Sequence, residues 1–256
     1  MDRLLFQSLA AAKSQGTVRA QLTNDLANTS TPGFKKSFDH VLLSSVKITA
    51  DYGYETRYQP IVQSANIIDL KSGPQIQTGR LMDISMQEKT VLGAITADGQ
   101  VAFTRRGDLR VLGDGTIALG NGLSVAGDDG APIQAPIGAN VYISNDGRIL
   151  ASLPEEPEGE QIPVGQLLLR DASEEVLIRR SDGLYEPRGR NGQGGDFEDG
   201  PNPISISIGA LEGSNVNPIE AMVRLIDFSR SFEAQVNVLK ETKDNDKSGA
   251  TMMRMS

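Results

Sequence analysis

Six Asp-Gly pairs punctuate the middle of this 256-residue chain, and they constrain its fold more than any other feature. They stand at 98–99, 114–115, 129–130, 146–147, 182–183 and 199–200, and Asn121-Gly122 adds a similar pair. Asp-Gly and Asn-Gly favour tight turns between antiparallel strands, because glycine accepts positive φ there. The β-prone runs between them include 101–104, 141–144, 166–169 and 204–208. The sequence therefore predicts a mostly antiparallel β-rich domain over residues 81–210, with a mobile glycine-rich loop at 188–203.

A helical pattern precedes this domain. Residues 1–28 contain no proline, and their apolar side chains recur at spacings of mostly three or four, interrupted at Gly16 and Arg19. The packing positions that we expect on this helix are Leu5, Leu9, Leu22 and Leu26. Together with the turn that follows it, the helix makes up residues 1–36.

The end of that segment predicts a sharp turn. Asn28 suits a helix C-terminus, because asparagine tolerates the left-handed conformation. Thr31-Pro32-Gly33-Phe34 fits a type II turn, in which proline presets φ at the second position and glycine accepts positive φ at the third. We expect Phe34 to anchor the turn. Residues 37–80 are ambiguous between short helix and strand, and we interpret them as an extended connector.

Helix returns in the C-terminal segment, residues 211–256. Asn217 can cap it, Pro218 fits the first helical position, and Glu220 lies three residues after the cap. Beyond the cap, apolar side chains alternate at spacings of three and four, which is typical of a heptad-like seam. The positions that we expect in this seam are Met222, Leu225, Phe232, Val236 and Leu239. The predicted fold class is α+β, with two terminal helices pairing into a coiled-coil-like layer beside the β domain.

Composition and charge exclude several classes of function. The chain carries 25 basic and 33 acidic side chains, and residues 151–200 hold 12 acidic against 5 basic ones. A nucleic-acid binder would show a basic face, so we expect no nucleic-acid partner. There is no cysteine, hence no disulfide or thiolate chemistry. No apolar run approaches the roughly 20 residues that span a bilayer, and no cleavable signal segment is predicted.

Catalytic and metal sites have weak candidates only. The single histidine, His40, has no cluster of carboxylates at metal-ligand spacing, and no nucleophile elbow accompanies it. The glycines of 189–195 lack the lysine and the following helix of a phosphate loop. Asp128-Asp129-Gly130 is the nearest approach to a cation site, but turn chemistry explains it sufficiently. We expect no cofactor, no metal and no catalytic residue.

Two motifs at opposite ends carry a resemblance. Leu26-Ala27-Asn28-Thr29-Ser30-Thr31-Pro32-Gly33-Phe34-Lys35 resembles the signature of the flagellar rod and hook family. The segment Leu211-Glu212-Gly213-Ser214-Asn215-Val216-Asn217-Pro218-Ile219-Glu220-Ala221-Met222 is similar to the family's C-terminal motif. The proline after Asn217 favours the proximal-rod members, with the distal-rod members as the alternative. The resemblance covers essentially the whole chain.

The resemblance implies a structural subunit rather than an enzyme. Its terminal helices would polymerise with other copies and other rod proteins into a tubular drive shaft, which transmits torque from rotor to hook across the periplasm. It also implies export by the flagellar type III apparatus. An alternative from a different class is a soluble β-domain adaptor whose helices close on each other as an intramolecular hairpin; a peptidoglycan hydrolase would need a carboxylate pair that no pattern here marks.

Overall fold

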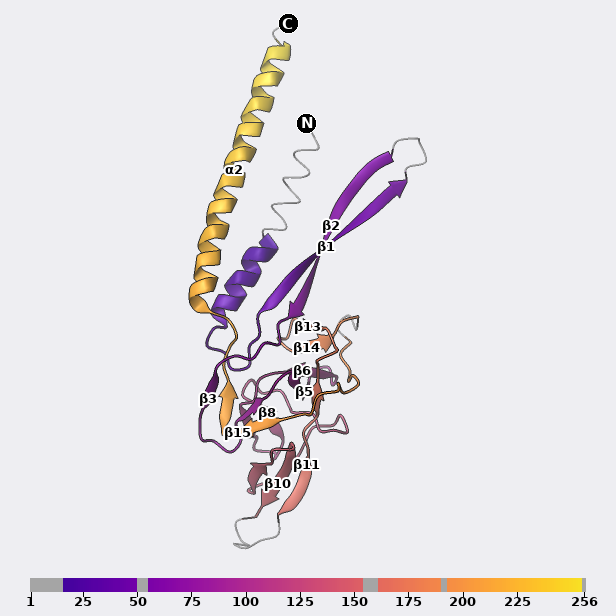
Figure 1. The fold of residues 1–256 in the computed structure, drawn as a ribbon, viewed down its shortest axis with the longest axis vertical. Coiled ribbons are helices and arrows are strands. Elements are labelled where there is room, and N and C mark those ends of the chain that lie inside the picture. Colours follow the sequence, from indigo (N-terminus) through magenta and orange to yellow (C-terminus); the bar gives the residue numbers. More distant parts are fainter. Residues whose placement is uncertain (1–15, 50–54, 154–160, 190–192, 255–256) are drawn as a thin grey trace. The chain divides into compact units, whose positions relative to one another are not determined.

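Strands dominate the computed structural model, which describes residues 16–49, 55–153, 161–189 and 193–254 (Figure 1). Within these ranges the chain forms a helix over 16–27, a series of mostly short strands, and a long helix α2, Pro218–Arg254. The chain divides into two compact units. The first comprises residues 1–27, 42–64 and 217–256, and the second comprises 28–41 and 65–216. The fold is therefore mixed, with a mostly antiparallel β-rich part.

The largest sheet has seven strands in the order β1-β2-β13-β14-β6-β5-β12. Its members are β1 (Ser37–Thr49), β2 (Glu55–Ile68), β5 (Thr90–Ile95), β6 (Val101–Thr104), β12 (Leu169–Asp171), β13 (Leu177–Arg179) and β14 (Tyr185–Pro187). Of residues 37–80, which the sequence left open between helix and strand, 37–49 and 55–68 form the long strands β1 and β2. Strand pairs such as β5–β6 and β13–β14 are antiparallel hairpins.

Smaller sheets complete the second unit. A three-stranded sheet contains β9 (Asn140–Ile143), β10 (Arg148–Ser152) and β11 (Ile162–Gln166). Three two-stranded sheets join β15 (Ile206–Ile208) to β4 (Ile84–Met86), β16 (Ala210–Glu212) to β3 (Gln75–Gln77), and β8 (Ile117–Leu119) to β7 (Leu109–Val111). β16 therefore brings the residues just before α2 back to the region just after β2.

The Asp-Gly pairs lie in turns, as their chemistry requires. Glycines 99, 115, 130, 147 and 183 all have φ between 75° and 86°, and Gly122 has φ 91°. Positive φ costs glycine nothing, whereas a Cβ would meet the following carbonyl. Asp199-Gly200 differs: Gly200 donates its amide to the Asp171 carbonyl at 3.1 Å, inside an irregular segment. This last pair fixes a loop rather than a hairpin.

That irregular segment, residues 193–203, is tied to the β domain. Phe197 is buried and meets the Phe103 ring edge-on, with 4.6 Å between the ring centroids. Gly195 donates to the Val101 carbonyl at 2.7 Å, and the Asp171 carboxylate accepts from the Asn202 amide at 2.9 Å. A segment rich in glycine and aspartate, which we expected to be mobile, thus contributes an aromatic ring to the core.

The core of the second unit contains two groups of buried side chains. The larger surrounds Ile84, Leu92, Leu119, Ile149 and Leu167; the smaller surrounds Val91, Phe103, Leu168 and Phe197. Consecutive residues of β5, and likewise Leu167 and Leu168, alternate between the two groups, as side chains do along extended backbone. The two groups therefore lie on opposite faces of the same strands.

Among the residues described, no helix is both long enough and apolar enough to cross a membrane.

Candidate functional site

The segment between the first helix and β1 forms the predicted turn. Phe34 donates its amide to the Thr31 carbonyl at 3.3 Å, and Gly33, at the third position of the turn, has φ 69°. Both features fit a type II turn. Asn28 accepts from the Thr31 amide through its carbonyl and from the Thr31 hydroxyl through Oδ1, at 3.2 and 3.1 Å. Residues 28–34 are thus held by their own hydrogen bonds.

This turn lies directly against the segment that precedes α2. Gly33 donates its amide to the Glu212 carbonyl at 2.7 Å. Asn215 then bridges the two segments twice: its amide donates to the Phe34 carbonyl at 3.2 Å, and its Oδ1 accepts from the Lys36 amide at 2.7 Å. The two motifs, which lie at opposite ends of the sequence, therefore meet inside the second unit. We call residues 31–36 with residues 210–216 the terminal junction.

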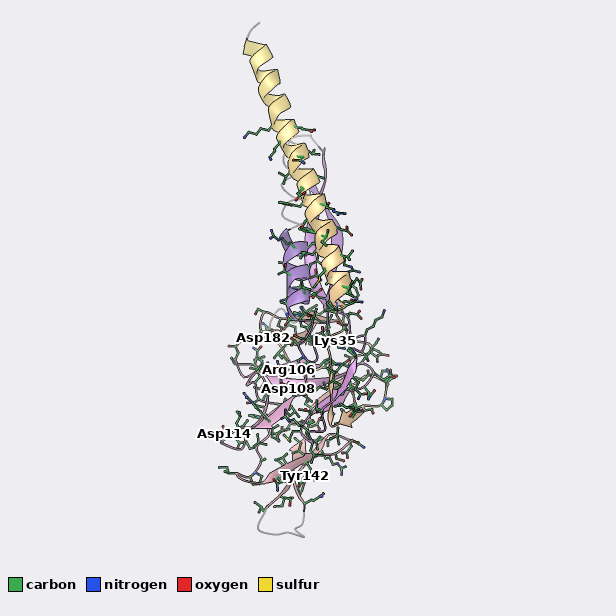
Figure 2. The ribbon with its side chains drawn as sticks, turned by 90° about the vertical axis from the view of Figure 1, so that its left-hand side faces the viewer. Lys35, Arg106, Asp108, Asp114, Tyr142 and Asp182 are labelled. Carbon is green, nitrogen blue, oxygen red and sulfur yellow. The ribbon has the colours of Figure 1, made fainter. Side chains whose placement is uncertain are left out.

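An ion triad is buried at the centre of the terminal junction. Lys35 Nζ donates to Glu212 Oε1 at 2.6 Å, and Arg105 Nε donates to Glu212 Oε2 at 2.7 Å. The side chains of Lys35 and Arg105 have no exposed surface, and that of Glu212 is 2% exposed. The triad joins the N-terminal turn, the end of β6 and the strand β16. Figure 2 labels Lys35 among the side chains of the second unit.

Each member of the triad has further partners. Lys35 Nζ also donates to the Lys71 carbonyl at 2.7 Å, and Glu212 Oε1 accepts from the Gly73 amide at 2.8 Å. The Arg105 guanidinium donates to three carbonyls between β4 and β5, those of Met86, Glu88 and Thr90, at 3.0, 2.8 and 2.7 Å. Glu88 has φ 49°, a left-handed conformation that is uncommon for a residue with a side chain.

Two cations share one carboxylate here, and this imbalance shapes the electrostatics. Burial is the largest influence on Lys35, and the nearby Arg105 charge is the next; together they lower the pKa of Lys35 to about 8, against the opposing pull of Glu212 and Asp69. Removing one partner from a buried ion pair costs about 3–5 kcal/mol, because the charge that remains is uncompensated. Glu212 is therefore the member on which both cations depend.

Arg179 of β13 and Tyr185 of β14 also contact the junction. Tyr185 donates its hydroxyl to the Gly33 carbonyl at 3.2 Å, and burial raises the pKa of this phenol to about 12. Arg179 donates to the Lys35 carbonyl and stacks over the Phe34 ring, 4.3 Å from its centroid. Phe34 is half-buried beneath this guanidinium, so the expected anchor is an aromatic ring against a cation.

Two glycines permit the close approach of the backbones. A Cβ on Gly33 would lie 2.3 Å from the Arg105 carbonyl carbon and oxygen, and a Cβ on Gly73 would lie 2.2 Å from the Gly213 oxygen. Neither contact is possible for a real side chain, because the opposing atoms are main chain and cannot rotate away. The triad thus requires glycine at both positions.

The terminal junction is built as an anchor rather than as a reaction centre. Both carboxylate oxygens of Glu212 and the Lys35 amine are engaged by protein groups at hydrogen-bond distance. Across the described ranges, no group of three or more His, Asp or Glu side chains could hold a metal ion. The arrangement can fix two chain segments to a β domain.

The cap of α2 has the geometry expected of Asn217. Its Oδ1 accepts from the amides of Ile219 and Glu220, at 3.0 and 3.3 Å, while Pro218 begins the helix. Glu220 makes an ion pair with Arg224, one turn further on, at 2.6 Å. These contacts satisfy amides that a helix N-terminus would otherwise leave without partners.

The expected packing positions on the helices differ in exposure. On α2, Leu225 and Val236 are half-buried, whereas Met222 and Phe232 are 52% and 41% exposed. The side chain of Leu239 is outside the described part. On the first helix Leu22 and Leu26 are half-buried, and Leu5 and Leu9 lie outside the described residues.

Sequence reasoning missed the triad. Lys35 follows Phe34 in the first motif, and Glu212 precedes Gly213 in the second. Neither neighbour indicates that the charged side chain is buried. Arg105 follows β6 in an Arg-Arg-Gly-Asp run, which is typical of an exposed turn. The one available signal was that both motifs of one family occur in the same chain, which could have suggested that they are in contact.

Comparison with known proteins places the chain in a family. Residues 208–252 match the family model described as flagellar basal body rod FlgEFG protein C-terminal. The chain is 31% identical to the flagellar basal-body rod protein FlgF of Salmonella typhimurium strain LT2 and 30% identical to FlgF of Escherichia coli K12, over the whole of each chain. It is 25% identical to the rod protein FlgG of Bacillus subtilis strain 168, covering 93% of this chain and 94% of that one. The higher identity at full coverage lies with FlgF. This chain belongs to the FlgF family of flagellar basal-body rod proteins.

Proposed function

We propose that this chain is a structural, non-catalytic subunit of the bacterial flagellar basal-body rod, and that it polymerises through its terminal helices. The observation that carries the proposal is the exposure of apolar side chains on α2. Ile219 is 74% exposed and Val238 is 62% exposed, while Val223 and Ile226 are 52% and 53% exposed. Membership of the FlgF family supports the rod as the place of assembly.

The exposed positions favour packing against other chains. α2 has 37 residues, so it is about 55 Å long at 1.5 Å per residue. Isolated helices are marginal in water, and most of their stability in proteins comes from packing an apolar face. A helix that shows isoleucine, valine, methionine and phenylalanine to solvent gains that packing when neighbouring subunits cover them.

In this proposal the N- and C-terminal helices pair in a coiled-coil-like layer that lines the rod. The chain has four functional parts: residues 1–36 and 211–256 as the two halves of an assembly domain, 37–80 as a connector, and 81–210 as an outer β-rich domain. Leu5, Leu9, Leu22 and Leu26 would face Met222, Leu225, Phe232, Val236 and Leu239 of the same layer. The apolar spacing of both segments supports this arrangement.

The partners follow from the same proposal. They are further copies of this chain, other rod proteins, and the type III export apparatus that delivers the subunit. The rod crosses the periplasm and transmits torque from rotor to hook. The sequence identity to FlgF proteins favours the proximal rod over the distal rod.

Phe232→Asp tests the assembly role, with Ser231→Asp as its matched control. Both positions are exposed on α2, and both substitutions place the same charge in the same turn, but only Phe232 belongs to the expected seam. The purified Phe232→Asp chain should keep its circular dichroism spectrum and change its free energy of unfolding by less than about 1 kcal/mol, as exposed substitutions usually do. In cells that lack their own copy, it should fail to restore rods and motility, whereas Ser231→Asp should restore both.

Two outcomes would contradict the proposal. Unfolding of the purified Phe232→Asp chain would point instead to a soluble adaptor, in which the two helices close on each other within one chain. Full motility with Phe232→Asp would remove this seam from rod assembly.

A further inference from the structure

The terminal junction contains one residue that both of its segments need. Glu212 accepts from the N-terminal segment twice, through its carbonyl from Gly33 and through Oε1 from Lys35. It holds its own segment by accepting from the Gly73 amide and by pairing β16 with β3 opposite Gln75. Through Oε2 it neutralises Arg105, whose backbone lies against Gly33. One carboxylate thus belongs to both attachments.

Each segment is poorly attached without the other. If residues 212 and 215 were removed from their place, the N-terminal turn would keep its hydrogen bonds to Tyr185, Arg179, Lys71 and Asp69. In that state Lys35 and Arg105 would be buried with no carboxylate between them. Two like charges without a counter-ion disfavour burial, which weakens the attachment of Lys35 and its segment to the β domain.

The reverse holds for the C-terminal segment. If residues 31–36 are absent from their place, Asn215 loses its contacts to the Phe34 carbonyl and the Lys36 amide, and Glu212 loses Lys35. The segment keeps the bonds of Glu212 to Arg105 and Gly73, of Gly213 to Pro74, and of the Asn215 side chain to the Asp69 and Lys71 carbonyls. β16 is only three residues long and pairs with a three-residue strand, β3, whose side chains are all exposed. Such a short pair has little stability of its own.

We propose that Glu212 couples the docking of residues 31–36 to the docking of residues 210–216, so that the two segments are released from the β domain together. The coupling is a conformational device of this chain and stands independently of rod assembly. It makes the connections to the two terminal helices a single cooperative unit, in the sense that each is stable only in the presence of the other.

Amide hydrogen exchange on the full-length chain tests the coupling, because each segment has its own reporters. The amide of Asp69, which donates to the Lys36 carbonyl, reports on the N-terminal segment, and that of Gly213, which donates to the Pro74 carbonyl, reports on the C-terminal one. Glu212→Gln keeps the shape of the side chain and removes its charge. Both reporter amides should exchange faster, by similar factors of a few hundredfold or more, which corresponds to loss of the partner of a buried charge.

Two further variants separate coupling from general damage. Asp171→Asn removes another buried carboxylate of the same unit, which holds Ser173 and Asn202, and should leave both reporter amides unchanged. Lys35→Met combined with Glu212→Gln restores the net charge of the triad and should recover most of the protection that Glu212→Gln loses. This double variant also decides the matter if Glu212→Gln fails to fold.

The results that would overturn the proposal are distinct. Faster exchange at Asp69 with unchanged exchange at Gly213 would show that the segments are released independently. A double variant that is less protected than Glu212→Gln, or that is itself unfolded, would show that the triad is held by individual contacts and not by its charge.

Discussion

Gly33→Ala measures how tightly the N-terminal turn is held against the β domain. Gly33 has φ 69°, and a Cβ there would lie 2.3 Å from two main-chain atoms of Arg105. Gly99→Ala is the matched control, because Gly99 has φ 75° in the β5–β6 turn and no atom lies within 4 Å of the added Cβ. Both variants place alanine in the left-handed region, but only in Gly33→Ala does the added Cβ also clash with other atoms of the protein.

The expected magnitudes separate these two contributions. Left-handed backbone costs an alanine about 1–2 kcal/mol, and the reduced entropy of the unfolded chain returns about 0.4–1 kcal/mol. Gly99→Ala should therefore lower the free energy of unfolding by about 1 kcal/mol. Gly33→Ala adds the strain of forcing an atom into a packed site, typically about 1–3 kcal/mol, which gives a total of about 2–4 kcal/mol.

Urea unfolding of the purified chain, followed by circular dichroism, measures both values under the same conditions. The Gly33→Ala midpoint should fall clearly below that of Gly99→Ala, with an unchanged slope. Equal midpoints for the two variants would refute the reasoning, because they would mean that residues 31–36 do not lie against Arg105 in solution.

Three further predictions concern single residues. The free energy of unfolding should rise between about pH 8 and pH 10, because the pKa of Lys35 is about 8 in the folded chain and 10.5 when unfolded, so the unfolded chain binds more protons there. The charged groups that face this amine are Arg105, Glu212 and Asp69. Urea titrations at each pH measure the rise, and Lys35→Met should flatten it. Phe197→Ala should cost about 3–5 kcal/mol in the same assay, since it empties the contact with Phe103, and a loss below 1 kcal/mol would mean that the 193–203 segment is not part of the core. Asn217→Ala should cost about 1 kcal/mol and speed amide exchange at Ile219 and Glu220; unchanged exchange at both amides would rule out the cap.

Local chemistry was predictable from the sequence where it depends on a few neighbouring residues. The β6 strand coincides with the predicted run at 101–104, and glycines 99, 115, 147 and 183 adopt the positive φ that their Asp-Gly pairs indicated. The Gly33 turn and the Asn217 hydrogen bonds follow from residue type and spacing within four positions. Each of these features is decided by contacts along the chain.

Long-range pairing was beyond the same reasoning. β13 lies between β2 and β14, and β15 pairs with β4, across more than a hundred residues. The apolar run at 166–169 looks like one strand, yet β11 ends at Gln166 and pairs with β10, whereas β12 begins at Leu169 and pairs with β5 in another sheet. Burial of Lys35 and Arg105 depends on a carboxylate at position 212, which no local pattern reveals.

The terminal junction also determines how the chain bears mechanical load. Lys35 and Glu212 are 177 residues apart in sequence, yet their side chains form a hydrogen-bonded ion pair. Tension that enters through the first helix and leaves through α2 would cross between residues 33–36 and 212–215, where backbone hydrogen bonds and the ion triad resist it side by side. The strands between these points would carry almost none of it. Apart from residues such as Gly73, Arg105 and Tyr185, which hold the junction, the β domain is then a closed loop outside the line of force.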